Sequence, residues 1–378
     1  MSIDNLPPLI AAQLEYLIAH SPLSIKVDQI WSGCQNSLYS DRFTLLIPFC
    51  LDYVKWDVIY NAQYPLAAPD IIFAPEDDDF HPIFMIDHGE GGNKTSKSSL
   101  FAWNCKDPTK LMSLIHELRD LYMAYQRKRV EEFDDARLKF EINTVLSREG
   151  LEVCLLSGPE KQEEVKFSVP VLDMNLNKLV HACPWRRQQK INLQIIFPVS
   201  RKYSTPAAPR VKLVASSELK ALFSVDDVKL PPWMDGMCLA EYLPTLEDHL
   251  GAKILEAVAS LGARRRFIEA LAPHFGRPIE ADPIFCRTAT VLAISGVFTF
   301  LVHFFLPAQF PKQQPVLMLQ SSQHFNAQLT PLMSPPLTEY PWSPRWDAPT
   351  MVERIRDFMV EECLNFKKYC NDAILQQQ

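Results

Sequence analysis

Residues 297–319 of the chain read VFTFLVHFFLPAQFPKQQPVLML, and this stretch decides the fold. Its two ends are apolar runs rich in Phe, Val and Leu, which predict two strands. Between them stand an aromatic–proline pair, Phe310-Pro311, and a second proline, Pro315. Proline has a fixed φ and no amide proton, so it suits strand ends and corners. The stretch therefore predicts two strands joined by a rigid connection.

The same sequence motif, two strands joined by an aromatic–proline pair and a second proline, occurs twice more in the chain and is the repeated phrase. One copy covers residues 53–73, with Tyr64-Pro65 and Pro69, and a blurred copy covers residues 191–214, with Tyr203, Pro206 and Pro209. Repetition of one phrase indicates a chain of several modules. The order strand, aromatic–proline, three residues, proline, strand resembles the connection between two central strands in ubiquitin-conjugating folds. We therefore expect repeated modules that mix helices with antiparallel strands.

Bulk composition restricts the class of protein. A chain of 378 residues, 47% hydrophobic and 22% charged, is long enough for two or three globular domains. The net charge of −7 argues against broad nucleic-acid binding, which needs a basic surface. The longest apolar run, residues 291–306, is interrupted by Ser295, Gly296 and His303, so we expect no membrane-spanning helix.

Cysteine and histidine usage gives no sign of a metal site. The nine cysteines are scattered without a Cys-x-x-Cys pair, and no signal-peptide pattern precedes them, which indicates a reduced, intracellular protein. Cys363 and Cys370 lie two turns apart on one predicted helix face and favour packing over ligation. His116-Glu117 begins a zinc-protease motif, but residue 120 is Asp. We expect no metal and no cofactor.

Helical periodicity and the repeated phrase together predict the domain organisation. Apolar residues recur at helical spacing over residues 108–146, a stretch of about 55 Å if unbroken, or two helices with a bend. Further helices are expected at residues 246–275, bounded by Pro244 and Gly276, and at residues 350–375. We predict an α+β chain of tandem ubiquitin-conjugating-like modules of the UEV or RWD type, joined by long helices. Each module is an antiparallel meander sheet with flanking helices, over residues 1–148, 149–244 and 245–378.

The chemistry of a ubiquitin-conjugating enzyme is missing where it is expected. Such an enzyme carries ubiquitin on an exposed cysteine that precedes a Trp turn at the start of the next helix. Trp103 and Trp342-Ser343-Pro344 resemble this turn, yet residues 90–100 and 320–340 contain no cysteine. We therefore predict no catalytic residue. The alternative is an active conjugating enzyme that uses Cys105 or Cys238.

One short segment is the best candidate for a partner-binding surface. Trp342, Arg345 and Trp346 lie within five residues of each other, and Trp and Arg are typical of interface hot spots. The competing interpretation places both Trp side chains in the module core. Glu76 to Asp79 form an acidic run that we expect to be solvated.

Several longer motifs resemble one family over nearly the whole chain. They include Asp41-Arg42-Phe43, Lys55-Trp56-Asp57, the run from Asn61 to Pro65, Trp103-Asn104, Arg265-Arg266, His274-Phe275-Gly276, Phe300 to His303, Leu306-Pro307, Gln314-Pro315, and Ser343 to Asp347. On these motifs the chain is similar to the BRE (brain and reproductive organ-expressed) family. The similarity fades between about residues 151 and 230, and the loop at 76–99 looks longer and more acidic than the family's.

The resemblance implies a non-catalytic subunit built from ubiquitin E2 variant (UEV) domains. BRE proteins belong to the BRISC deubiquitinase and to a nuclear DNA-damage complex. Their implied partners are a JAMM-type metalloprotease that cuts lysine-63-linked ubiquitin chains, an Abraxas-type scaffold and a Merit-type subunit. Polyubiquitin and death receptors are further candidates. The resemblance also implies a cytoplasmic and nuclear protein with roles in DNA repair, chromatin regulation, cell division and restraint of apoptosis.

Two adaptor hypotheses stay open beside the enzyme alternative. In the first, the modules bridge the Merit-type subunit to the catalytic and Abraxas-type core. In the second, the modules form an arm that recruits substrate to the protease. The sequence does not separate them, because a shared fold hosts many functions.

Overall fold

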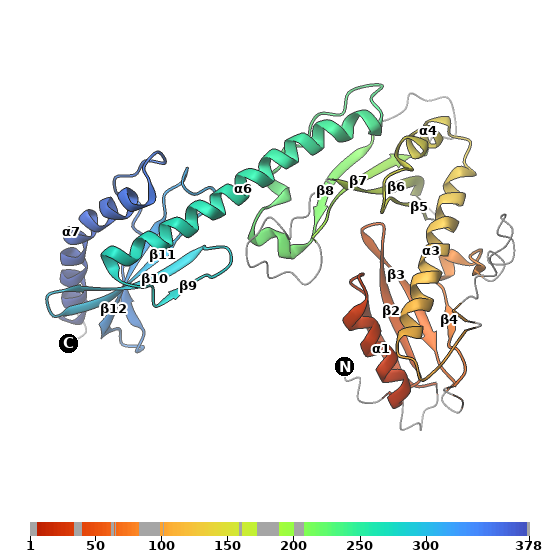
Figure 1. Cartoon of the computed structure of the whole chain (residues 1–378), viewed down its shortest axis with the longest axis horizontal. Helices are drawn as coiled ribbons and strands as arrows, with labels where there is room; N and C mark the ends of the chain where they lie inside the picture. The colour runs from red at the N-terminus through yellow and green to blue at the C-terminus, as the bar shows by residue number, and fades with distance from the viewer. Residues whose placement is uncertain are drawn as a thin grey trace. The chain divides into compact units, whose positions relative to one another are not determined.

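A computed structural model describes residues 6–33, 40–61, 64, 66–82, 99–100, 102–158, 161–171, 189–199 and 208–375. The chain is α+β, with three antiparallel sheets and helices beside them (Figure 1). It divides into two compact units. The first unit contains Met1–Val171, Ile191–Val214 and Pro231–Leu243, and the second contains Leu172–Lys190, Ala215–Leu230 and Pro244–Gln378.

The first sheet has the order β1-β2-β3-β4. Its strands are β1 (Lys26–Trp31), β2 (Arg42–Phe49), β3 (Asp52–Ile59) and β4 (Asp70–Ile72), followed by a short 3-10 helix, η2 (Pro75–Asp77). Helices α1 (Pro8–His20) and α3 (Thr109–Glu131) share one buried core with this sheet. Trp56 and Phe43 lie at its centre because alternate residues of β2 and β3 point to the same face.

The second sheet, also in the first unit, has the order β5-β6-β7-β8. Its strands are β5 (Glu152–Gly158), β6 (Lys161–Val171), β7 (Ile191–Pro198) and β8 (Arg210–Ala215). Along β7 every second residue is buried, ending at Phe197, as strand alternation requires. Helix α4 (Ala136–Val145) buries Leu138 and Ile142.

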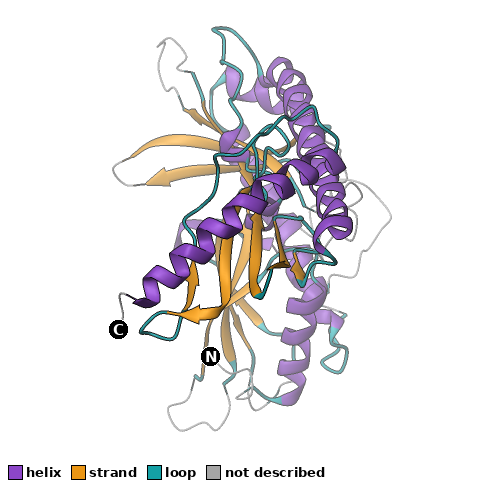
Figure 2. Cartoon of the chain, turned by 90° about the vertical axis from the view of Figure 1, so that its left-hand side faces the viewer, coloured by secondary structure: helices purple, strands orange, loops and turns teal. Residues whose placement is uncertain are grey.

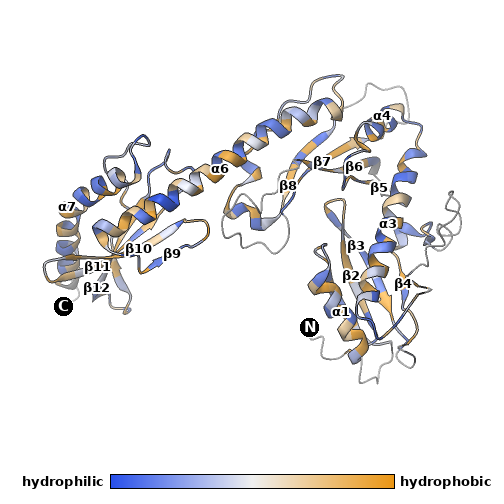
Figure 3. Ribbon diagram, viewed as in Figure 1, coloured by the Kyte–Doolittle hydropathy of each residue, from blue (hydrophilic) through white to orange (hydrophobic). Residues whose placement is uncertain are grey.

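The third sheet lies in the second unit, in the order β13-β12-β11-β10-β9. Its strands are β9 (Glu280–Ala281), β10 (Thr288–Ser295), β11 (Phe298–Phe305), β12 (Val316–Phe325) and β13 (Pro331–Met333). Helix α7 (Ala348–Leu375) packs on this sheet (Figure 2), and Figure 3 shows hydrophobic and hydrophilic stretches alternating along the helix. Cys363 and Cys370 belong to the buried core, so their predicted packing role is confirmed.

The repeated phrase has the same place in all three sheets. It lies between β3 and β4, between β7 and β8, and between β11 and β12, and the Phe310–Pro311 peptide is cis. Tyr203 and Pro206 of the blurred copy fall outside the described residues. The predicted α+β class with antiparallel meanders is confirmed, and the division into three UEV-like modules stays a prediction.

Two predicted helices differ in their bounds. The stretch at 108–146 forms two helices, the bent alternative, because Asp135 caps α4 by accepting from the amides of Arg137 and Leu138. The helix expected from residue 246 begins earlier, as α6 (Leu239–Phe275), and runs through Pro244. Leu239 and Tyr242 are buried, so packing outweighs the missing amide of proline. Across the described chain, no helix has the length and apolar character needed to cross a membrane.

Candidate functional site

The predicted Trp turn of the second unit is anchored to the repeated phrase. The indole Nε1 of Trp342 donates a hydrogen bond to the carbonyl of Pro311 at 3.0 Å, and its ring lies 5.6 Å from the Phe310 ring. Trp342 is half-buried against the core of the third sheet. This tryptophan therefore holds the connection between β11 and β12 against the segment that leads into α7.

The rest of this segment is more accessible. Arg345 is exposed, and Trp346 is half-buried with the Arg354 guanidinium 5.9 Å from its ring centre. Asp347 accepts from the Thr350 amide at 3.0 Å and so caps the start of α7. The structure thus separates the three predicted contact residues: Trp342 and Trp346 both pack against the core of the third sheet and are half-buried, while Arg345 borders solvent. Their role in partner binding stays a prediction.

The Trp turn of the first unit contacts α1 through Gln13. Trp103 is half-buried with its ring 6.4 Å from that of Tyr60, and the carbonyl of Cys105 accepts from the side-chain amide of Gln13 at 2.9 Å. Gln13 also accepts from the Tyr60 hydroxyl at 2.7 Å. The segment where a conjugating enzyme would carry its thiol, residues 90–100, lies mostly outside the described residues.

Neither candidate thiol of the enzyme alternative is hydrogen-bonded to a general base in the described residues. Cys105 contributes its backbone carbonyl to the contact with Gln13. Cys238 precedes α6, where its amide donates to the Glu241 carboxylate at 3.2 Å and its carbonyl accepts from the amides of Glu241 and Tyr242. This pattern is half of a capping box, so Cys238 starts a helix.

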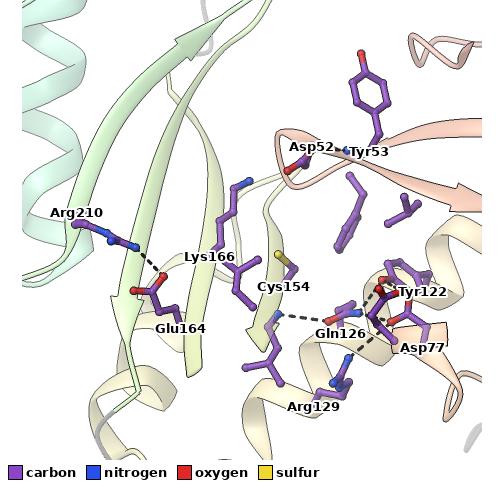
Figure 4. A pocket seen from close by; sticks show the side chains of 15 residues that line it. Asp52, Tyr53, Asp77, Tyr122, Gln126, Arg129, Cys154, Glu164, Lys166 and Arg210 are labelled. Carbon is purple, nitrogen blue, oxygen red and sulfur yellow. Dashed lines mark hydrogen bonds and ion pairs between the residues drawn. The ribbon is translucent and has the colours of Figure 1, made fainter. Parts of the chain in front are cut away.

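A cleft of about 730 Å³ in the first unit is a feature that the sequence did not indicate (Figure 4). One wall carries Asp77, which is only 6% exposed, whereas Glu76, Asp78 and Asp79 of the same acidic run are exposed as expected. Its carboxylate accepts from the Tyr122 hydroxyl at 2.9 Å and the Gln126 amide at 3.2 Å, and Arg129 lies 3.7 Å away. Burial raises the pKa of Asp77, while Tyr122 and Arg129 oppose the shift.

The opposite wall of the cleft comes from β5 and β6. Cys154, Leu155 and Leu156 contribute from β5, and Glu164 and Lys166 contribute from β6. Glu164 pairs with Arg210 of β8 at 2.6 Å. Lys166 is 8% exposed, and its ammonium has no hydrogen bond or ion pair among the described residues. The cleft therefore contains one cation without a counter-ion beside a cysteine.

A second set of contacts ties the β2–β3 turn to β5. Arg119 of α3 forms an ion pair with Glu152 and donates from Nε to the carbonyl of Pro48 at 3.0 Å. Glu152 also accepts from the amide of Cys50. No local sequence pattern predicts these contacts, since Cys50 and Glu152 are 102 residues apart in sequence.

The titratable residues do not gather into a metal centre. Within the described ranges no group of three or more His, Cys, Asp or Glu side chains could hold a metal ion. His303 of β11 bonds to Thr290 at 3.0 Å and to Gln320 at 2.9 Å, so both of its ring nitrogens have partners in the sheet.

Fold and site together define an α+β protein of repeated antiparallel meanders whose two Trp turns have no cysteine in the segment before them. Comparison with known families identifies it further. The model of the BRE family, "Brain and reproductive organ-expressed protein (BRE)", matches residues 10–325, and the chain belongs to this family.

Two curated relatives match over most of their length. A protein of Danio rerio named "BRISC and BRCA1-A complex member 2" is 29% identical over 348 residues, covering 88% of this chain and 86% of the relative. A protein of the same name from Branchiostoma floridae is 28% identical over 340 residues, covering 87% of this chain and 84% of the relative. The segment at 342–346 lies beyond the family match, which ends at residue 325.

Proposed function

We propose that this chain is a non-catalytic subunit of a deubiquitinase complex. The observation that carries the proposal is membership of the BRE family over residues 10–325. Both relatives are named as members of the BRISC and BRCA1-A complexes. Family membership at this coverage supports an assembly role of the same kind for this chain.

The proposed architecture is three UEV-like modules, over residues 1–148, 149–244 and 245–378. Its support is the repeated phrase, which lies between the third and fourth strands of each sheet. Three sheets of the same connectivity offer several separate edges and faces to partners. Such a chain is suited to joining other subunits rather than to enclosing a substrate.

The absence of conjugating chemistry supports a binding role. Residues 90–100 and 320–340 contain no cysteine, so the two recognisable Trp turns have no thiol at the position that a conjugating enzyme uses. The alternative thiols are poorly suited, since Cys105 contacts α1 through its backbone and Cys238 starts α6.

The proposed partners are a JAMM-type protease specific for lysine-63 linkages, an Abraxas-type scaffold and a Merit-type subunit. The chain would bridge the Merit-type subunit to the other two in the cytoplasm and nucleus, with polyubiquitin and death receptors as further candidates. Among described surfaces, Arg345 and Trp346 are the proposed contact, with Trp342 holding their segment in place. Arg345 is exposed and charged, so its replacement tests contact without disturbing the core.

Co-expression with the three partner subunits tests the proposal. The full chain is expected to co-purify with them, and the assembled complex to cleave lysine-63-linked chains faster than the protease and scaffold alone. Arg345→Glu and Trp346→Ala are expected to weaken capture of a partner, whereas Arg277→Glu, an exposed charge reversal in the same unit, serves as the matched control. Equal capture by all three folded variants would remove the segment from the proposal.

A separate assay addresses the enzyme alternative. The chain is incubated with a ubiquitin-activating enzyme, ATP and ubiquitin, and separated without reducing agent. We expect no adduct. A reducing-agent-sensitive ubiquitin adduct that is lost in Cys105→Ser or Cys238→Ser would overturn the non-catalytic assignment.

A further inference from the structure

Two cysteines from distant parts of the sequence meet inside the first unit. Cys50 lies in the β2–β3 turn with a φ of 49°, and its sulfur is 3.3 Å from the carbonyl of Lys166 and 3.8 Å from that of Glu152. Cys154 pairs with Lys166 across β5 and β6. Residues two apart on a strand share a face, so Cys154 points to the same side as Glu152, which bonds Cys50. Because Lys166 is the strand partner of Cys154, the Cys50 sulfur lies against the β5–β6 pair at the position of Cys154.

The two thiols differ in access. Cys154 lines the cleft and is half-buried, and Figure 4 shows its sulfur near Lys166. Cys50 is almost fully buried and does not line the cleft. A small reagent that enters the cleft therefore meets Cys154 first. Cys50 lies behind it, held by the turn and by its amide bond to Glu152.

The charges around the pair also differ in their effects. A hydrogen bond from Cys50 lowers the pKa of Cys154, as does the Lys166 ammonium, while burial, Asp52 and Glu152 oppose this shift. The pKa of Cys50 is raised, because it donates to Cys154 and because it is buried. The Cys50 thiol is buried and donates to the carbonyl of Lys166 at 3.3 Å, which favours its protonated form. With the pKa of Cys154 lowered and that of Cys50 raised, the thiolate of the pair forms on Cys154.

The position of Lys166 is a second observation that favours a thiolate on Cys154. Lys166 is 8% exposed as a residue and lines the cleft, and its ammonium has no ion pair in the described part of the chain. Glu152 pairs with Arg119 and Glu164 pairs with Arg210, and Asp52, the exposed carboxylate at the rim of the cleft, forms no ion pair with Lys166. A cation without an ion pair favours an anion beside it, and its strand partner Cys154 can supply one as the thiolate.

We propose that Cys154 and Cys50 form a peroxide-reactive pair, in which Cys154 is the attacking thiol and Cys50 the resolving thiol. The Cys154 thiolate attacks one oxygen of a hydroperoxide. The O–O bond breaks, a sulfenic acid forms on Cys154, and the other oxygen leaves as hydroxide and takes up a proton. Cys50 then loses its proton and attacks the Cys154 sulfur, so the S–O bond breaks, water leaves and a disulfide forms. The two sulfurs lose two electrons, and the peroxide oxygens gain them.

The product would link the β2–β3 turn to β5 across one wall of the cleft. This disulfide closes a long loop that includes α3 and α4, so it restricts the unfolded chain strongly and should raise the unfolding temperature of the first unit. It is reversible by thiol reductants. A pair of this kind suits a reducing compartment, in which protein disulfides are usually transient and redox-sensing.

Peroxide treatment of the full-length chain tests the pair. After hydrogen peroxide, blocking of free thiols and proteolysis, mass spectrometry is expected to find the Cys50 peptide joined to the Cys154 peptide, and dithiothreitol to release it. In Cys50→Ser a dimedone adduct should accumulate on Cys154, because the sulfenic acid is no longer resolved. Lys166→Met should slow that labelling, because loss of the ammonium raises the pKa of Cys154 and lowers its thiolate fraction.

Cys105→Ser, a change at another half-buried thiol, is the matched control and should leave the linked peptide unchanged. Circular dichroism of each variant checks folding. If Cys50→Ser is unfolded, dimedone labelling is measured in the unmodified chain under peroxide instead. Cys154 is then expected to be labelled faster than Cys105 and Cys238. The proposal is overturned if no Cys50–Cys154 link forms and Cys154 reacts no faster than those two thiols.

Discussion

Replacement of Arg264 by methionine is expected to loosen the connection that contains the repeated phrase in the second unit. Arg264 lies in α6 and is 1% exposed. Its Nε donates to the carbonyl of Phe285 at 2.9 Å, and Nη1 donates to that of Ala308 at 3.1 Å. Ser260, one turn earlier, bonds the carbonyls of Ala308 and Phe310 as well. One buried guanidinium thus joins α6 to the segment before β10 and to the segment after β11.

The expected loss of stability follows from these bonds. A hydrogen bond from a charged donor contributes about 1.5–3 kcal/mol net, so the two short bonds contribute about 3–6 kcal/mol. The cost of burying the charge places the result at the lower end, since burial lowers the pKa of Arg264 to about 10. Methionine fills the space but removes the two guanidinium donors, so the Ala308 carbonyl keeps only Ser260 among the bonds described above. We expect a loss of about 3 kcal/mol in the second unit.

Hydrogen exchange of the full-length chain measures this change locally. Amides over residues 298–319 should exchange about 150-fold faster in Arg264→Met, which corresponds to about 3 kcal/mol of lost protection. Arg266→Met, two positions on and exposed, is the control and should change protection by less than about 0.5 kcal/mol. If the two variants exchange alike over these residues, the assigned role of Arg264 is wrong.

Three further predictions concern single contacts. Asp77→Asn should have the same free energy of unfolding as the wild type in acid and become relatively more stable as pH rises above about 4, because the raised pKa of Asp77 makes its ionisation unfavourable in the folded state. Urea denaturation across a pH series measures this difference in stability, and a difference that does not change with pH would contradict the prediction. Asp135→Ala should cost about 1 kcal/mol by removing the cap of α4, seen as faster exchange of the amides at 137–142, and unchanged exchange would refute the cap. Trp342→Phe should cost about 1 kcal/mol by removing the Nε1 bond to Pro311, measured by exchange at 310–316.

The proposed relation to conjugating enzymes concerns the fold of this chain and not its chemistry. The sheets, the aromatic–proline connections and the Trp turns form a scaffold whose cohesion comes from buried side chains such as Trp56 and Phe300. A thioester site needs only one exposed thiol in addition. The segments that precede Trp103 and Trp342 have none, so the scaffold can be retained for binding alone.

Helix ends show how far local sequence patterns can be trusted in this molecule. Asp135 caps α4 through its own side chain, so the start of this helix depends on residues that are local in sequence. Pro244 predicts a boundary, yet α6 runs through it. The difference arises because Leu239 and Tyr242 gain burial when the helix begins early, and that gain depends on distant residues.

The sequence by itself determined the α+β class, the three meanders, the missing thiols and the family, because each of these is carried by periodicity or by short motifs. Only the tertiary structure decided that Asp77 is buried under Tyr122, 45 residues away, and that Cys50 meets the strand of Cys154 more than a hundred residues on. It likewise turned Trp342 inward and left Arg345 in solvent. Contacts between distant segments depend on how the whole chain packs, and local patterns carry no signal for them.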